Sequence, residues 1–233
     1  MTPKTIFQAV LVATLAMLAV APAARAQDDP TIFIVSYIEV TPASKAAAAT
    51  LLRQVRDASR KDDGLIRLEV LQRTTPSNQF VILEIWKDQQ ALDAHAAAAH
   101  AKQFREKLTP ILLAPVDDRL GITTTVDPLQ AARARATPGA VTVVTHVDVG
   151  PPNRDKAAAA LKTLAEASRK EAGNLRFDVV HQKNRTNHFT VIEVWKDQKS
   201  DDAHEHAAHT KDFRGVLTPL TGALYDQRWY KAL

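Results

Sequence analysis

Apolar and polar residues alternate along several short stretches of the chain, and this two-residue period is typical of β-strands. Between two of these stretches, apolar residues recur at a helical spacing, in a stripe of Ala48, Leu51, Leu52 and Val55. Taken in order, the patterns predict the succession β-α-β-β-α-β. The expected elements are a strand at 32–40, a helix at 42–63, strands at 66–70 and 80–87, a broken helical region at 88–109 and a strand at 116–123.

The chain contains an internal repeat with a shift of 109 residues. The segment Glu84–Gln89 returns as Glu193–Gln198 with a single substitution. The same shift holds without a gap from Phe33 to Leu120, where about 35 of roughly 88 positions are identical. Chance does not explain a match of this length, so the chain is a tandem duplication, and each copy carries the ferredoxin-like order of elements.

A ferredoxin-like unit leaves one face of its antiparallel sheet open, because both helices lie on the other face. In this sequence the open face is moderately apolar and has to be covered. A second copy in the same chain can cover it. We therefore expect an α+β fold in which two tandem βαββαβ repeats pack sheet against sheet as a pseudo-dimeric α+β barrel, while association into a homo-oligomer stays open.

The first residues of the chain are typical of a signal peptide. Lys4 precedes an apolar run from Ile6 to Ala21, and Ala24-Arg25-Ala26 places small residues at the positions that signal peptidase recognises. The run is shorter than the roughly 20 residues of a membrane span, so we expect cleavage after Ala26, no stable membrane anchor, and a periplasmic or secreted protein. The expected organisation is a signal peptide at 1–26, a first domain at 27–121, a linker at 122–139 and a second domain at 140–233.

Charge and cysteine content exclude several classes of function. The formal charge falls from +4 to +2 on removal of the leader, which carries Lys4 and Arg25 and no acidic residue. Basic and acidic residues alternate along both copies, as on a solvated surface, so we expect no nucleic acid partner. Because the chain has no cysteine, thiolate nucleophiles and cysteine-bound clusters are excluded. Any chemistry must come from other side chains or from a group that they hold.

One face of the third strand carries a carboxylate among large apolar side chains. By the strand period this face consists of Phe80, Ile82, Glu84 and Trp86, and the second copy repeats it with Glu193 and Trp195. A carboxylate on an apolar face requires a hydrogen-bond partner. Glu84 therefore either bonds a neighbouring group for structural reasons or serves a ligand, and Trp86 either packs in the core or stacks on a substrate.

Each copy also carries two histidines five residues apart: His95 and His100 in the first, His204 and His209 in the second. On an unbroken helix their rings would point about 140° apart, so they converge only if the helix breaks between them. His100 lies in register with Phe104, and His209 with Phe213 in the second copy. A histidine on such a stripe is either a hydrogen-bonded core residue or a functional group, and its recurrence leaves both interpretations open.

We expect no metal site and no cofactor. The HExxH spacing is absent, and His206 and His209, three residues apart, would share an ion only weakly, while the first copy has Ala97 in place of His206. The sequence also lacks a glycine-rich phosphate loop, a G-x-S-x-G elbow and a dinucleotide fingerprint.

The segment from Glu84 to Phe104 resembles the signature of the antibiotic-biosynthesis-monooxygenase family. In that family a Glu-x-Trp strand precedes a helix with Ala-x-x-x-His, then a second histidine and a phenylalanine four residues later. The residues here are Glu84-x-Trp86, Ala91-x-x-x-His95, His100 and Phe104, and Glu193 to Phe213 is similar. The resemblance covers the mature chain twice and implies a dimeric α+β barrel whose better-known members oxidise quinols and polyketide phenols with O2, often without metal or flavin.

The resemblance implies a monooxygenase in which a histidine takes a proton from a small phenol or quinol, and the leader implies that this enzyme is exported. The expected catalytic residues are His100, His209, Glu84 and Glu193, and the expected substrate-binding residues are Trp86, Trp195, His95, His204, Phe104 and Phe213. We expect His100, Trp86 and Glu84 to line one cavity, with His95 at its rim. Leu92 becomes Asp201 and Ala97 becomes His206 in the second copy, so the twin cavity differs, and loss of activity in one copy stays open. The rival functions are a binding module for a small aromatic ligand, and haem binding or degradation.

Overall fold

A computed structural model describes residues 31–122, 139–223 and 225–233 of the chain. The expected signal peptide at 1–26 and residues 123–138 of the expected linker lie outside the described residues. Among the described residues, no helix combines the length and the apolar character needed to cross a membrane.

Both copies have the predicted order of elements, with the second helical region divided into two helices. The first copy comprises β1 (Ile32–Glu39), α1 (Lys45–Ser59), β2 (Leu65–Arg73), β3 (Gln79–Trp86), α2 (Gln89–Ala97), α3 (Ala99–Leu108) and β4 (Asp117–Ile122). The second comprises β5 (Val141–Asp148), α4 (Arg154–Ser168), β6 (Asn174–Gln182), β7 (Arg185–Trp195), α5 (Gln198–His206), α6 (Ala208–Leu217) and β8 (Asp226–Ala232). Short 3₁₀ turns precede α1 and α4 and follow α3 and α6.

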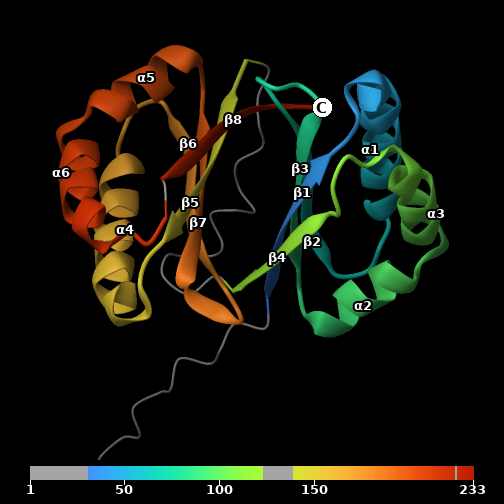
Figure 1. Ribbon diagram of the computed structural model, residues 1–233, viewed down its shortest axis with the longest axis horizontal. Helices are drawn as coiled ribbons and strands as arrows, with labels where there is room; N and C mark the ends of the chain where they lie inside the picture. Colours follow the sequence, from blue (N-terminus) through green and yellow to red (C-terminus); the bar gives the residue numbers. More distant parts are fainter. Residues whose placement is uncertain (1–30, 123–138, 224) are drawn as a thin grey trace, which may run out of the picture.

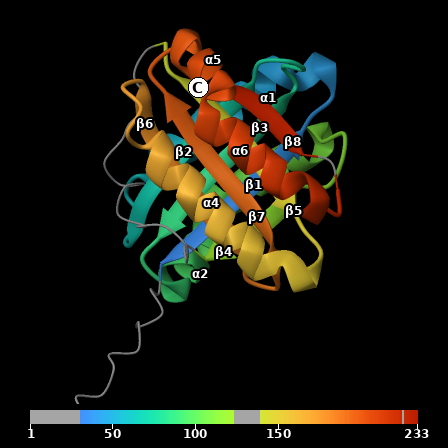
Figure 2. The same ribbon diagram turned by 90° about the vertical axis from the view of Figure 1, so that its left-hand side faces the viewer.

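The eight strands form one closed antiparallel barrel in the order β1-β3-β2-β8-β5-β7-β6-β4. The last strand of each copy joins the two halves, because β4 pairs with β6 and β8 pairs with β2. Figure 1 shows the two sheets facing each other across the middle of the molecule, with the helices of each half on the outside. In Figure 2, α4 and α6 lie across the outer face of the second half. The predicted pseudo-dimeric α+β barrel is confirmed.

The inner faces of the two sheets form a shared apolar core. Its buried members come from both halves: Phe33, Val35, Leu71, Val81, Leu83, Ile85, Val144, Val180, Ile192 and Tyr230. Alternation along each strand sends the other set of side chains outward to the helices. On β3, for example, Val81 and Leu83 point into the barrel, while Phe80 and Ile82 pack with α1 and α3. The second copy covers the apolar face that the first leaves open.

A buried ion network also links the halves. The guanidinium of Arg176 on β6 is fully buried and donates to Asp178 at 2.5 Å and, across the barrel, to Glu69 on β2 at 2.6 Å. Burial alone would raise the pKa of Glu69, but the charge of Arg176 holds it below its ordinary value. A buried charge without a partner is costly, so this network ties the second half to the first.

Candidate functional site

The helical region after β3 breaks at one residue, and this break brings the two histidines of the first half together. Asp88 caps α2 by accepting a hydrogen bond from the amide of Ala91. Ala98 then adopts an extended conformation (φ −63°, ψ 147°), so that α2 ends and α3 starts in a new direction. The condition for convergence of His95 and His100 is therefore met, and their ring centroids lie 5.4 Å apart.

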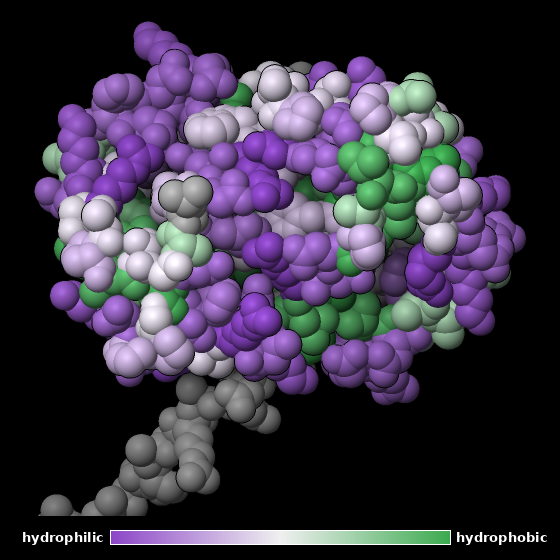
Figure 3. Space-filling view, in the orientation of Figure 1, coloured by the Kyte–Doolittle hydropathy of each residue, from purple (hydrophilic) through white to green (hydrophobic). Residues whose placement is uncertain are grey.

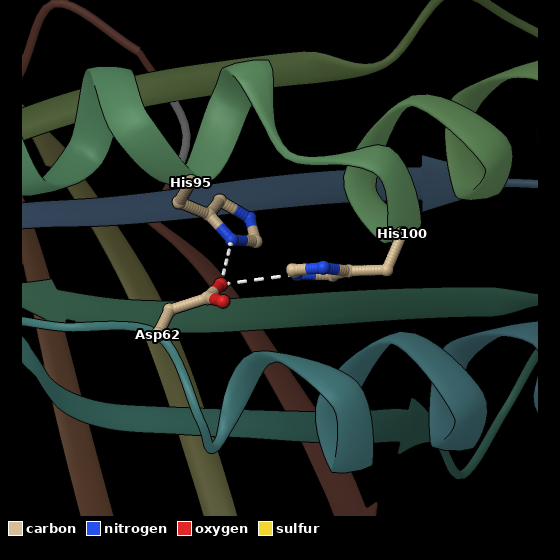
Figure 4. Close-up of side chains that lie close together, drawn as sticks. All are labelled: Asp62, His95 and His100. Carbon is tan, nitrogen blue, oxygen red and sulfur yellow. Dashed lines mark hydrogen bonds and ion pairs between the residues drawn. The ribbon is translucent and has the colours of Figure 1, made fainter.

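Both rings bond the same carboxylate oxygen (Figure 4). Nδ1 of His95 lies 2.6 Å from Oδ2 of Asp62, and Nε2 of His100 lies 3.0 Å from the same atom. A carboxylate only accepts hydrogen bonds, so each of these nitrogens carries its hydrogen. For His95 this leaves Nε2 as the unprotonated nitrogen of the neutral ring.

Asp62 lies in the turn after α1, and glycine lets this turn approach α2. Gly64 has a φ of +82°, and a Cβ there would lie 2.6 Å from Cβ of Ala91. In the second half a Cβ on Gly173 would lie 2.2 Å from Cβ of Ser200. Any larger residue would therefore push the turn, and the carboxylate it carries, away from the histidines.

Glu84 and Trp86 form a second bonded pair on the outer face of β3. Nε1 of Trp86 donates to Oε2 of Glu84 at 2.7 Å, and the Trp86 ring lies over His95 with centroids 4.7 Å apart. Burial raises the pKa of Glu84 above its ordinary value, and the hydrogen bond from Trp86 opposes that rise. Trp86 is fully buried. Its indole therefore holds the side chains of Glu84 and His95 in place through the hydrogen bond and the ring contact.

A cavity of about 300 Å³ opens between β3 and the helices of the first half. Its polar lining groups are Ser36, Glu84, His95, Arg105 and Asp118. The rest of the lining is mainly apolar: Ile34, Ile38, Val55, Leu68, Ile82, Leu92, Ala96, Ala101, Phe104, Leu108, Val116 and Leu120. An apolar pocket with a few converging polar groups is typical of a small-molecule site. In Figure 3 apolar residues gather on the visible face of the first half, at the right of the view.

In the second half the corresponding space carries larger side chains. Under the shift of 109 residues, Leu68, Val116 and Leu120 become Phe177, Tyr225 and Trp229. Phe177 is fully buried, and Tyr225 and Trp229 pack against the core that contains it. Polar residues take three further positions of the lining: Asp201, Glu205 and Thr210 replace Leu92, Ala96 and Ala101.

These polar replacements bond neighbouring side chains. Nε1 of Trp229 donates to Asp201 at 2.8 Å, Arg214 donates to Glu205, and Gln227 donates to Glu205 at 2.7 Å. Burial raises the pKa of Asp201 and raises that of Glu193 to about 8. In the second half, larger side chains and their hydrogen bonds therefore take up the space that forms the cavity in the first half.

The triad of two histidines and a carboxylate, by contrast, is present in both halves. Glu171 Oε1 lies 2.7 Å from Nδ1 of His204 and 2.9 Å from Nε2 of His209. Ala207 breaks the helix as Ala98 does, with φ −63° and ψ 150°. Trp195 stacks on His204 at 4.6 Å and donates to Glu193 at 3.1 Å.

The structure brings the predicted residues together but reverses the expected positions of the histidines. His95 lines the cavity with Glu84 and Phe104, whereas His100 lines a separate surface groove of about 170 Å³. Trp86, expected to stack on a substrate, stacks on His95 and does not line the cavity. The break at Ala98 causes this difference, because it turns α3 so that His100 bonds Asp62 from the side of the surface groove.

In the second half, Glu193, Trp195, His204 and Phe213 are all buried, and His209 is partly exposed. The histidines are therefore reversed here as in the first half, since His209 was expected to line the twin cavity and His204 to lie at its rim. The larger side chains around them occupy the space that a ligand would need.

Sequence reasoning missed Asp62 and Glu171. Both stand in a turn, away from the strand and helix patterns on which the candidate residues were chosen. A signal was nevertheless available: the gap-free repeat places a carboxylate at this position in both copies, directly after an identical Ser-Arg-Lys and two residues before an identical glycine.

Two segments of the chain, residues 31–107 and 140–216, match the family described as antibiotic biosynthesis monooxygenase. The chain belongs to this family. Each match spans one copy of the repeat, so the protein carries two antibiotic biosynthesis monooxygenase domains in tandem.

Individual relatives agree with this assignment. The chain is 30% identical over 86 residues to the Bacillus subtilis protein named "Putative monooxygenase YcnE", and the match covers 37% of this chain and 90% of that protein. Among solved structures, the chain superposes on a "putative monooxygenase" from Fusobacterium nucleatum with a TM-score of 0.76 and 18% sequence identity. The match covers 89% of this chain and 94% of that protein. An anthrone oxidase-like protein has a TM-score of 0.66 at 15% identity, covering 88% and 92%. These two likenesses concern the fold, and both extend over the two halves.

Proposed function

We propose that the protein is a monooxygenase that oxidises a small phenol or quinol with O2 in the cavity of its first half, without a metal or flavin. The observation that carries the proposal is the position of His95. One ring nitrogen is fixed by Asp62 at 2.6 Å, and the same side chain lines the cavity next to Glu84. Membership of the family supports the reaction class.

In this proposal His95 is the general base. Asp62 fixes the tautomer in which Nε2 is free to accept a proton, and it stabilises the charged ring that results. Trp86 prevents the imidazole from rotating by stacking on it. Removal of a phenolic proton makes the ring electron-rich enough to pass an electron to O2, so the protein needs to supply only position and a base.

The reaction needs no external reductant. One hydrogen of an activated ring carbon, the hydroxyl hydrogen and one oxygen atom leave as water. The second oxygen atom forms a carbonyl at that carbon, so the phenol becomes a quinone and O2 receives all four electrons from the substrate. Glu84 is suited to bind a substrate hydroxyl, because its carboxyl lines the cavity and accepts hydrogen bonds, and burial raises its pKa. The apolar wall that includes Phe104 suits the aromatic face.

The proposal includes export, on the strength of the apolar run and the Ala24-Arg25-Ala26 site. Mass spectrometry of the protein recovered from the periplasm or medium should find Gln27 as the first residue. An intact N-terminus in a membrane fraction would refute this part.

Oxygen uptake by the purified mature protein tests the function. A panel of small quinols and polyphenols is assayed with and without chelator, under ¹⁸O2, and products are analysed by mass spectrometry. We expect substrate-dependent uptake that persists with chelator and one ¹⁸O atom per product. Affinity without uptake would instead identify a binding module, and a coloured protein with a strong near-ultraviolet band would identify haem binding.

A further inference from the structure

Three potential metal ligands meet at the edge of the first half. The donor atoms of Asp62, His95 and His100 all lie within 4.8 Å of one another. Two imidazole nitrogens and one carboxylate oxygen are the donor set that Zn²⁺ and non-haem Fe²⁺ use in sites that keep open positions. The absence of HExxH spacing does not exclude this site, because its carboxylate comes from a turn 33 residues before His95.

The second half has the same arrangement. Glu171, His204 and His209 also bring their donor atoms within 4.8 Å of one another. The carboxylate there is one methylene longer, and the cavity beside it is filled, yet the three donors still converge. The cluster therefore does not depend on the open cavity, and a role confined to cavity chemistry does not account for its presence in both halves.

The position of the cluster suits an ion that arrives from solvent. The side chains of His95, Asp62 and His100 are 11, 18 and 25% exposed. Water can therefore complete the coordination sphere. A tetrahedral ion about 2.0–2.2 Å from each donor would hold the donors about 3.3–3.6 Å apart, which is about 1 Å or less beyond the 2.6 and 3.0 Å that already separate the nitrogens from Asp62. Only small side-chain movements are needed to admit it.

We propose that Asp62, His95 and His100 bind a divalent first-row transition-metal ion such as Zn²⁺, and that Glu171, His204 and His209 form a second site of the same kind. In the first site the ligands are Oδ2 of Asp62, Nδ1 of His95 and Nε2 of His100. An ion on Nδ1 of His95 places that ring's hydrogen on Nε2. If His95 is the base of the proposed function, bound Zn²⁺ then inhibits turnover.

Co²⁺ titration of the untagged, chelator-treated mature protein tests the sites without any substrate, so its outcome is independent of the monooxygenase proposal. We expect visible d–d absorption that saturates at two ions per chain and disappears when Zn²⁺ is added. His100→Ala and His209→Ala should each reduce the stoichiometry to one, and the double variant should bind none. Asp62→Asn, which keeps the shape of the side chain and removes its charge, should weaken the first site more than about tenfold.

His206→Ala is the matched control, since this exposed histidine lies on α5 and bonds the carbonyl of Asp202 instead of the cluster. It should bind two ions like the unmodified protein. Thermal unfolding of each variant checks that it is folded. Equal Co²⁺ binding by the unmodified protein and the double variant would overturn the proposal, as would the absence of saturable binding in the folded protein.

Discussion

The two halves of the molecule have the same fold and the same cluster of two histidines and a carboxylate, but they differ in the space beside it. In the first half, Leu68, Val116 and Leu120 leave a cavity of about 300 Å³. In the second, aromatic side chains stand at all three positions. A barrel closed by two copies needs both for stability, since the inner faces of the sheets form one core. The barrel does not need both copies to bind a ligand.

This difference distinguishes the bonded residues that are common to both halves from the residues of the cavity wall, which are not. The Glu-x-Trp pair and both histidines are the same in each half. The substitutions fall on the cavity wall, where Asp201 and Glu205 replace apolar residues and find partners in Trp229 and Arg214. In our account, the first half holds the ligand and the second half is a filled copy that supports it.

The largest expected difference concerns the two equivalent histidines. His95→Ala should lower turnover by about 10²–10⁴-fold because it removes the proposed base. His204→Ala should leave turnover within a few-fold and lower the free energy of unfolding by about 1–3 kcal/mol, since it leaves Glu171 without a buried partner. Oxygen uptake and denaturant unfolding measure the two effects. Equal loss of turnover in both variants would contradict the division of roles.

A smaller effect is expected from exchanging one residue of the cavity wall. Leu68→Phe gives the first half the residue that fills the second, and should weaken binding of a small phenol by about 10–100-fold because the ring must be displaced. The matched change Phe177→Leu should leave that affinity unchanged and destabilise the protein by about 1–3 kcal/mol through the space it opens. Titration calorimetry and urea unfolding report these outcomes. Unchanged affinity in Leu68→Phe would show that the ligand binds elsewhere.

The smallest effect, for a change of one pH unit, concerns the pH dependence of stability. Burial raises the pKa of Glu193 to about 8, well above that of glutamate in an unfolded chain. The folded protein therefore binds more protons than the unfolded chain between about pH 4.5 and 8, and its stability should fall as the pH rises through this window. The slope from this group is at most about 1.4 kcal/mol per pH unit.

Glu193→Gln keeps an acceptor for Trp195 and cannot ionise, so it should flatten that slope. Glu84→Gln is the matched control in the open half and should change the slope less, because Glu84 lines an open cavity. Urea unfolding at pH 5, 6, 7 and 8 gives the comparison. Parallel pH profiles for the unmodified protein and Glu193→Gln would disprove the assignment.

The fold could be predicted from the sequence because its signals are local and repeated. Strand alternation, the apolar helical stripe and the shift of 109 residues together indicate two βαββαβ units, and the open apolar face of each unit indicates how they pack. The pair formed by Glu84 and Trp86 could also be predicted, since the two residues share a face of one strand.

The arrangement of the histidines could not be predicted, because it depends on where the expected break in the helical region falls, and no residue marks that place. The break falls at Ala98, within a run of four alanines, where helix propensity favours continuation. Tertiary contacts decide the outcome: Asp62, brought close by Gly64, bonds both His95 and His100. Reasoning from periodicity placed His100 in the cavity because it lacked this long-range contact.

Crystals soaked with 4-bromophenol give the most direct test of the central claim, because the anomalous signal of bromine locates the ligand without assumptions about turnover. We predict one site per chain, between Glu84 and His95 in the first half. A bromine site between Glu193 and His204, or equal occupancy of the two halves, would contradict the account.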